Sequence, residues 1–346
     1  MKKFWFLPIL VLGCAQNLMD EIKIMGQPSQ NIPVKMRALS DGRVVILFRD
    51  YSTYKYEVKL AHPRTGESKT LTLGNPEAPV LALRVGKGDT IFILTLEKGH
   101  IKLHEFTPNG IPSGKYVLKD AELPVDFLVT SSGEKGEHIM TLNAAGALVS
   151  IFDRTGKLLA GAGPSTGPEG PYMKGHLALV QSSRMLLVVP NFIKSVCGNC
   201  PKDDIKGSIR VYQWIGEMTV MPDSFPLIKQ IDVEPFLPDA DVIQVYAARG
   251  CGDRAYEFAT FSKAVDPQIP KFITGYALMK IDPSTGASEI AMTMNYEELY
   301  QGEDGRYYDE QGNYKPSITA ADISRDGKKL FLAYADSHVE VCEIAD

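Results

Sequence analysis

The stretch FDRTGKLLAGAGPSTGPEGPYM, residues 152–173, decides the fold. It begins at the end of an apolar segment, turns sharply at 153–156, and resumes briefly as 157–162 before glycine and proline take over. Two short strand-like segments around a Gly-containing turn are typical of a β-hairpin. The brevity of the returning segment predicts an outermost strand on an exposed rim, followed by a crossing to the next structural unit.

The same pattern recurs along the chain. Each unit has an apolar strand, a Gly/Asp turn, a second apolar strand, an alternating third strand, a TG- or NG-type turn and a short fourth strand. The units begin near residues 34, 80, 125, 177, 242 and 318. Six four-stranded units in radial array predict an all-β, six-bladed β-propeller.

Closure of the ring depends on the N-terminal part of the chain. The last unit lacks an outer strand, and a spare strand-like segment lies at 21–25. We expect it to pair beside 339–344, because closure removes an open sheet edge. A seven-bladed ring, with a strand pair hidden in 295–315, and a two-sheet sandwich remain alternatives.

The opening stretch also carries a resemblance. Its strand, DxxG turn, short strand and Gly-x-Gly-Pro order resembles the blade junction of NHL-like and TolB-like six-bladed propeller lipoproteins of bacteria. Gly163-Pro164 and Gly167-Pro168-Glu169 stand where those proteins cross to the next inner strand. The resemblance covers this junction, supports the fold and carries no catalytic residue.

The N-terminus is predicted to be an export signal. Lys2 and Lys3 precede an apolar segment at 4–12, which has the length of a signal-peptide core. The following Gly13-Cys14 resembles the bacterial lipobox, which implies cleavage before Cys14 and acylation on it. We therefore expect a signal peptide at 1–13, a lipidated tether at 14–20 and a propeller domain at 21–346. A secretory signal with a chance cysteine is the alternative.

Composition narrows the partners and the location. The 346 residues are 44% hydrophobic and 23% charged, with a formal net charge of −5. This balance, without a Lys/Arg-rich run, predicts no nucleic-acid partner. The lipid anchor predicts attachment to a membrane of the cell envelope. The absence of an acidic residue after Cys14 favours the outer membrane, on its periplasmic or surface side.

Antiparallel strands sort the connections of a propeller onto two faces. The crossing face carries the turns between second and third strands and the crossings between blades. The turn face carries the first-to-second and third-to-fourth turns. The long segments all fall on the crossing face, in the second half of the chain: 163–175, 191–206, 232–241, 262–271 and 295–316. Because long loops are frequently functional, we expect the working surface on the crossing face of blades four to six.

The cysteines suggest one structural cross-link. Cys197 and Cys200 lie in a Gly/Asn/Pro-rich loop of an exported chain, so a local disulfide is the favoured interpretation. A redox pair would normally open a helix, and a zinc or haem site would want further ligands. Cys251 is expected on the turn face, and Cys342 is expected to be buried in a strand.

Candidate binding residues come from two long segments of the crossing face. The 295–316 segment is rich in acidic residues and tyrosines, and tyrosine gives large, rigid contact area with a polar tip. The alternative is that these tyrosines pack the loop onto the blade ends. Two further acidic residues lie beside the CxxC. The predicted set is Tyr300, Tyr307, Tyr308, Asp304, Asp203 and Asp204.

Two classes of function fit this sequence. The first is a binding module that displays a protein- or glycan-recognition surface in the envelope, without catalytic residue, cofactor or metal. The second is an enzyme that resembles propeller lactonases, whose central channel holds a divalent cation by inner-strand Glu, Asn and Asp. Only Asp126, Gln244 and Asp322 offer such oxygens on the inner strands. We therefore expect a binding module rather than an enzyme.

Overall fold

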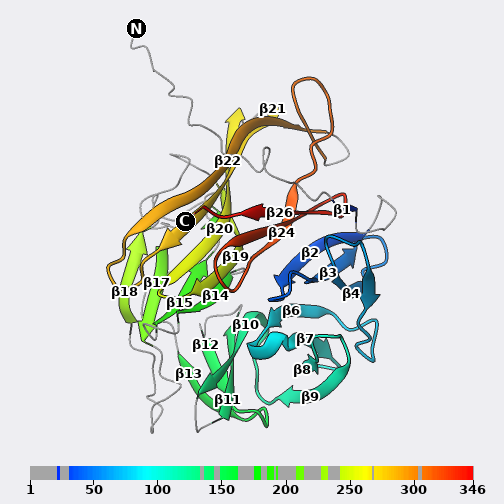
Figure 1. The fold of residues 1–346 in the computed structure, drawn as a ribbon, viewed down its shortest axis with the longest axis vertical. Coiled ribbons are helices and arrows are strands. Elements are labelled where there is room, and N and C mark those ends of the chain that lie inside the picture. The colour runs from blue at the N-terminus through cyan, green and yellow to red at the C-terminus, as the bar shows by residue number, and fades with distance from the viewer. Residues whose placement is uncertain are drawn as a thin grey trace.

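The chain folds as an all-β, six-bladed β-propeller, as predicted (Figure 1). The computed structural model describes residues 22–23, 31–132, 136–143, 149–162, 175–180, 185–190, 192–193, 208–213, 227–232, 242–266, 269–302 and 306–345. Among these residues the only helical segment is one 3-10 turn, η1 (Lys87–Asp89). No helix in this part of the chain has the length and hydropathy needed to span a membrane.

The first three blades are regular four-stranded antiparallel sheets. Blade one comprises β2 (Asn31–Ala38), β3 (Val44–Asp50), β4 (Tyr56–Ala61) and β5 (Ser68–Thr70). Blade two comprises β6 (Val80–Val85), β7 (Ile91–Glu97), β8 (His100–Phe106) and β9 (Pro112–Leu118). Blade three comprises β10 (Pro124–Ser132), β11 (Gly136–Asn143), β12 (Val149–Phe152) and β13 (Leu158–Ala162).

The other three blades are less uniform. Blade four comprises β14 (Gly175–Val180), β15 (Met185–Pro190), β17 (Ser208–Gln213) and β18 (Leu227–Asp232). Blade five is a six-stranded sheet of β16 (Phe192–Ile193), β19 (Val242–Cys251), β20 (Arg254–Asp266), β21 (Ile269–Ile281), β22 (Ser288–Gln301) and β23 (Tyr307–Tyr308). Blade six comprises β24 (Ile318–Ile323), β25 (Lys329–Tyr334) and β26 (His338–Glu343).

The N-terminal strand completes blade six, as predicted. β1 (Ile22–Lys23) pairs antiparallel with β26, with Ile22 opposite Val339 and Lys23 opposite His338. The outer strand of the last blade thus comes from the other end of the sequence. No seventh blade lies among the described residues, because the strands found within 295–315 extend the sheet of blade five.

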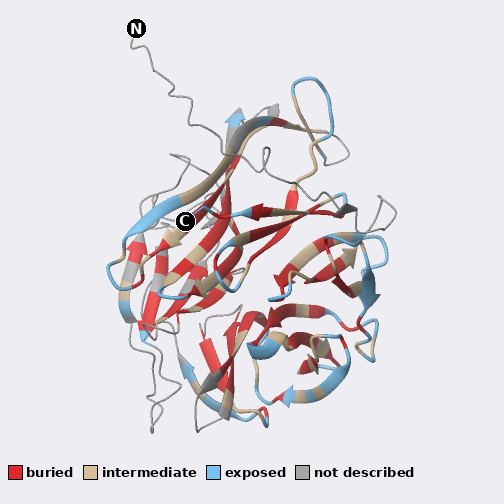
Figure 2. Ribbon diagram, in the orientation of Figure 1, coloured by how far each residue is buried: buried red, intermediate tan, exposed pale blue. Residues whose placement is uncertain are grey.

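The hydrophobic core is divided into six clusters, one between each pair of neighbouring blades. Alternate residues of the second strand of each blade face opposite neighbours, which is why these strands read as largely apolar runs rather than as alternating ones. In β7, for example, Ile91 and Ile93 face blade one, whereas Phe92 and Leu94 face blade three. Burial is concentrated in the middle of the strands, and the outer rim is exposed (Figure 2).

The Asp153 turn of the opening stretch is fixed locally. The Asp153 carboxylate accepts hydrogen bonds from the backbone N–H of Thr155 at 2.8 Å and of Lys157 at 3.0 Å. Gly156 adopts φ +78°, the left-handed region that favours glycine. The Asp-x-x-Gly pattern therefore works as a self-contained turn, and β13 is the short outermost strand predicted.

Blade five projects beyond the ring on the crossing face (Figure 1). Its middle strands run for 13 or 14 residues, whereas no strand of another blade exceeds nine. We call the arm the part of β20 from Ser262, of β21 up to Thr274, of β22 from Asn295, and β23 together with the following residues up to Tyr314, which pairs with Tyr308.

The arm corrects two predicted loops. Residues 262–271 form most of a hairpin, and the 295–316 segment contains the end of β22 and all of β23. Likewise, Phe192 and Ile193 of the predicted 191–206 loop pair with β19. Polar residues in these segments suggested loops, but their backbone groups are satisfied by cross-strand pairing.

Candidate functional site

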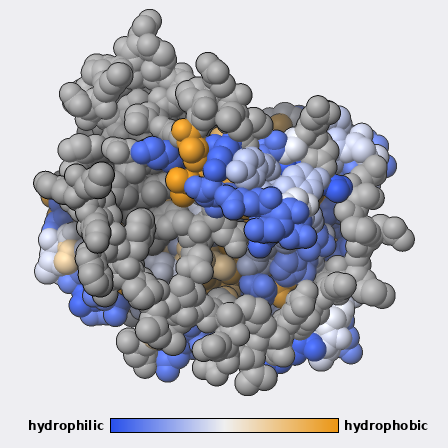
Figure 3. Space-filling model, turned by 90° about the horizontal axis from the view of Figure 1, so that it is seen from above, coloured by the Kyte–Doolittle hydropathy of each residue, from blue (hydrophilic) through white to orange (hydrophobic). Residues whose placement is uncertain are grey.

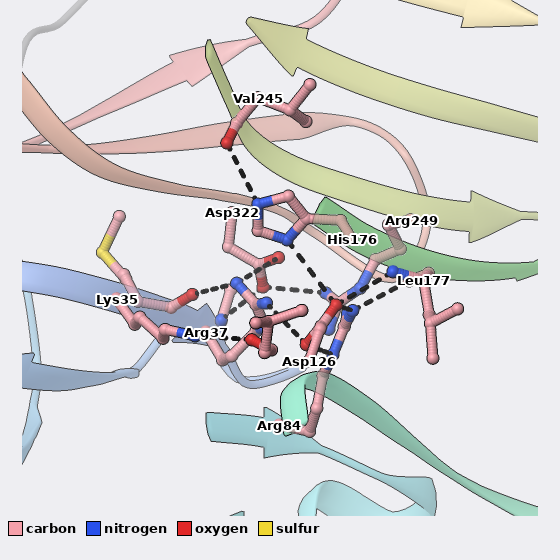
Figure 4. A network of polar contacts seen from close by, with 12 residues as sticks. Lys35, Arg37, Arg84, Asp126, His176, Leu177, Val245, Arg249 and Asp322 are labelled. Carbon is pink, nitrogen blue, oxygen red and sulfur yellow. Dashed lines mark hydrogen bonds and ion pairs between the residues drawn. The ribbon is translucent and has the colours of Figure 1, made fainter. Parts of the chain in front are cut away.

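Every inner strand sends a polar or charged side chain to the axis of the propeller (Figure 4). Five of these residues are charged and one is a histidine, and together they form one connected network at the hub. The six residues are Arg37 of β2, Arg84 of β6, Asp126 of β10, His176 of β14, Arg249 of β19 and Asp322 of β24.

Asp126 binds partners from three other blades. Its carboxylate accepts from Arg84 Nε at 3.0 Å and from the Arg84 Nη2, and it accepts the backbone N–H of Leu177 at 2.9 Å. The guanidinium of Arg37 lies 3.8 Å away, and His176 Nδ1 lies 3.6 Å away. These cations and donors hold the pKa of Asp126 well below its usual range, despite burial that would raise it.

Asp322 links blades five, six and one. It accepts the backbone N–H of Ala38 at 2.8 Å and lies 3.2 Å from Arg249 and 3.9 Å from Arg37. Arg249 also donates to the carbonyl of Ile323. Arg37 thus stands between the two carboxylates, and the network runs around the whole hub.

The hub carries more positive than negative charge. Burial and the neighbouring Arg84 lower the pKa of Arg37 to about 10, so it stays protonated at neutral pH. Burial also lowers the pKa of His176, and its Nε2 donates to the carbonyl of Val245 at 3.0 Å. Three arginines therefore face two carboxylates beside a histidine.

Sequence reasoning found the two hub carboxylates and missed the arginines. A pattern that marks the hub residues is nevertheless present. Four of the six inner strands have a β-bulge, and a charged residue follows the bulged residue three positions later. The four segments are VKMR at 34–37, LALR at 81–84, YAAR at 246–249 and TAAD at 319–322. A bulge re-aims the side chains that follow it. The sequence prediction considered only oxygen ligands for a metal on the inner strands, so it did not include the arginines at this position.

The hub chemistry also bears on the lactonase-like alternative. Both inner-strand carboxylates are engaged by arginines, and Gln244 lies on β19 in register with Thr260. The described residues contain no group of three or more His, Cys, Asp or Glu side chains placed to hold a metal. A divalent cation in this channel would have to displace the guanidinium groups that already neutralise Asp126 and Asp322.

The predicted tyrosines come together on the arm. Tyr300 lies opposite Tyr308 across the β22–β23 pair, and the ammonium of Lys271 is 5.2 Å from the centre of the Tyr300 ring. The Tyr307 ring meets Phe272 edge-on at 6.2 Å. All three tyrosines are half-buried. They therefore pack within the arm itself, as the alternative interpretation expected, and each keeps part of its surface exposed.

The remaining predicted site residues cannot be placed. Asp203, Asp204, Asp304, Cys14 and the Cys197–Cys200 pair lie outside the described residues, so their roles stay predictions. Cys251 is a buried free thiol, and burial raises its pKa to about 12, which makes it unreactive at neutral pH. Cys342 is buried, as predicted.

A second aromatic group on the crossing face was missed from the sequence. It belongs to the β3–β4 connection of blade one. The guanidinium carbon of Arg49 lies 4.7 Å from the ring centre of Tyr51, 5.8 Å from that of Tyr54 and 5.7 Å from that of Tyr56. Tyr54 is 69% exposed. Cation–π contacts of this kind hold the rings in place while they face solvent.

Comparisons with known proteins agree with the fold. No protein-family model matches the sequence, and no curated protein matches it. A solved streptogramin B lyase structure resembles the chain with a TM-score of 0.50 and 14% sequence identity, over 94% of this chain and 97% of that one. The C-terminal WD40 domain of Sif2 gives a TM-score of 0.45 and 13% identity, over 93% of this chain and 84% of that one. At 14% identity the likeness to the lyase structure shows the propeller fold alone.

Proposed function

We propose that this propeller is a lipid-anchored binding module of the cell envelope that holds a protein partner on its crossing face, through the arm of blade five. Acylation of Cys14 would place the ring at a membrane, with the tether of residues 14–20 as spacer. Recognition then needs no catalytic residue and no cofactor.

The arm is the observation that carries this proposal. Four short strands are enough for a propeller blade. The sheet of blade five continues beyond this length by about ten further cross-strand residue pairs, which form the projecting arm. The projection is braced internally: Lys271 forms an ion pair with Glu298 at 2.5 Å, and Tyr308 packs against Tyr314 at 6.2 Å. A rigid projection presents side chains without the entropy cost of ordering a loop on binding.

The exposed chemistry of the arm suits a protein partner. Tyr314 is 39% exposed and Val265 is 46% exposed, amid charged residues such as Glu298 and Arg306. Seen from the arm end of the molecule, the described surface is mainly hydrophilic, with a small hydrophobic group near the middle of the view (Figure 3). Apolar and aromatic anchors surrounded by a polar rim are the usual anatomy of a protein interface.

A glycan partner is the second candidate. It is favoured by the Arg49 cluster, because exposed tyrosine rings offer flat faces for sugar stacking. The lactonase-like enzyme is less well supported, since the channel carboxylates are engaged by arginines.

The test captures the acylated full-length protein from membranes of its own host and quantifies co-purified proteins by mass spectrometry. A double variant, Val265→Ser with Tyr314→Ser, removes two exposed anchors of the arm. We expect it to lose about tenfold of the specific partner, since each anchor contributes on the order of 1 kcal/mol.

The control is Ile111→Ser on the turn face, where Ile111 is 56% exposed. It removes a comparable exposed apolar group and should retain the partner. Equal recovery with the arm variant and the control would contradict the choice of surface. Loss of glycan-array binding in Tyr54→Ser, with protein capture intact, would favour the glycan candidate.

A further inference from the structure

A basic cavity lies at the mouth of the central channel, on the turn face and therefore opposite the arm. It has a volume of about 570 Å³ and is walled by the ends of β6, β10, β14 and β19 and by the turns after β6, β19 and β24. Four of its lining residues are cations: Arg84, Lys87, Arg249 and Arg325. The described residues of its lining include no carboxylate.

The charges at this mouth do not balance. Arg84 forms an ion pair with Asp126, and Arg249 forms an ion pair with Asp322. With Arg37 in the same network and Lys87 and Arg325 at the rim, five cations face two carboxylates, which leaves three positive charges near the cavity.

Three acidic residues of the described turns lie near the cavity without lining it. Asp89 accepts from the backbone and hydroxyl of Ser40, Asp253 lies 4.0 Å from Arg254, and Asp326 accepts from Ser324. Asp253 and Asp326 each neighbour a lining residue in sequence, and the Asp326 carboxylate also accepts the backbone N–H of Lys328 within its own turn. The charged side chains of the described lining itself are therefore all cations.

Arg325 is placed to cover the cavity. It extends from the turn after β24 to the turn after β6, where it donates to the carbonyl of Gly86. That acceptor is neutral, so the contact positions the guanidinium without neutralising it. Lys87 stands exposed at the same rim. The deep arginines and the rim cations thus surround one space from several sides.

Three glycines line the cavity, so no side chain projects into it at these positions. Gly250 of β19 packs so closely on blade four that a Cβ there would lie 2.0 Å from the carbonyl oxygen of Leu179. Gly86 and Gly252 also line the cavity. The volume falls within the range of small-molecule sites, about 300–1,000 Å³.

We propose that this cavity binds a small molecule through a phosphate group of charge −2 or more. Guanidinium groups present planar forks of N–H donors that match phosphate oxygens, and a multiply charged anion offsets the three excess positive charges. The site is independent of the arm and extends the binding role of the protein to a second ligand.

The experiment uses isothermal titration calorimetry of the full chain with pyrophosphate at fixed ionic strength. Arg325→Gln removes one rim cation outside the hub network, and we expect it to weaken binding about tenfold, the effect of one charge-assisted contact. Lys87→Gln is the second variant, and its affinity should fall in the same direction. Unchanged thermal unfolding of both variants confirms that the fold is intact.

Lys328→Gln is the matched control, because it removes an exposed charge from the same turn as Arg325 but does not line the cavity. It should change the affinity less than twofold, and Tyr314→Ser on the arm should leave it unchanged. Absence of pyrophosphate binding, or equal losses in Arg325→Gln and Lys328→Gln, would overturn the proposal. Tighter binding of citrate than of pyrophosphate would overturn the phosphate assignment.

Discussion

At the scale of single residues, the turn at 153–156 does more than reverse the chain. Gly156 lies against the outer strand of blade two, and its carbonyl accepts the N–H of Lys119 at 2.8 Å. A Cβ at Gly156 would lie 1.9 Å from the carbonyl oxygen of Val117. Glycine is therefore required twice, by its positive φ and by the approach of the neighbouring backbone.

We predict that Gly156→Ala lowers the free energy of unfolding by about 2–4 kcal/mol, because left-handed strain adds to displacement of a neighbouring strand. The control is Gly99→Ala, at φ +79° with nothing within 4 Å of the added carbon, which should cost only about 1 kcal/mol. Urea denaturation of both variants measures the difference. Equal costs would show that the close approach contributes nothing.

Sequence reasoning at this scale worked where the signal was local. The Asp153 turn follows from residues that bind one another within five positions. The hub residues are different, since Arg84 and Asp126 are 42 positions apart and meet only when blade two packs against blade three. Nothing local distinguishes Arg84 from a solvated arginine. Only alignment of the inner strands against one another would have revealed it.

At the scale of elements, blade five shows where pattern and pairing diverge. The sequence predicted long connections at 262–271 and 295–316, in place of continued strands. In the structure both strands continue, with Thr274 opposite Glu297 and Lys271 opposite Tyr300. A strand exposed on both faces has no apolar periodicity, so hydrophobic pattern cannot mark its end. The existence and type of elements were predictable, and their lengths were not.

The β20 strand contains an isolated buried acid. Glu257 is 3% exposed, lies between Ala248 and Met279 on the neighbouring strands, and has an oxygen without a hydrogen-bond partner among the described residues. Burial raises its pKa to about 8. The folded state therefore keeps a proton that the unfolded state releases near pH 4.5, so stability falls as pH rises between these values and is constant above them.

We predict that Glu257→Gln removes this slope. The variant should gain roughly 2–3 kcal/mol relative to the wild type between pH 5.5 and pH 8.5, at 1.36 kcal/mol for each unit of pKa difference that is crossed. Urea unfolding at both pH values measures it. Glu289→Gln, at an exposed position on β22, is the control and should follow the wild type. Parallel profiles for Glu257→Gln and wild type would show that Glu257 ionises in the folded protein.

At the scale of the whole molecule, the number of blades was predictable because each blade repeats the same pattern of strands and turns. The six interblade cores follow from that repetition, since the second strand of a blade, such as β7, contributes apolar side chains to the cores on both of its sides. The hub network is the part that no single blade contains. It joins all six inner strands by charge, and its integrity is a property of the closed ring.

We predict that Asp126→Asn lowers the free energy of unfolding by about 3 kcal/mol at neutral pH, because it leaves Arg84 and Arg37 without their shared counter-charge. The depressed pKa of Asp126 gives a stabilisation that is present above the ordinary Asp pKa of 3.8 and is lost as pH falls below it. The difference between variant and wild type should therefore shrink in acid.

Guanidinium denaturation at pH 7 and pH 3 measures this effect. Asp120→Asn is the matched control, since Asp120 is exposed and its φ of 57° is tolerated by asparagine. A neutral outcome at pH 7 would mean that the arginines find other partners and that the hub does not depend on this carboxylate.

The pairing of β1 with β26 has a consequence for the life of the polypeptide before it is folded. Ile22 and Val339 are partners, so synthesis must be almost finished before the last blade can gain its fourth strand. Until then the growing chain carries unpaired strand edges and an incomplete charged axis, both of which invite aggregation. Because its ring cannot close early, the nascent chain keeps its last blade incomplete until the C-terminal strand has been made.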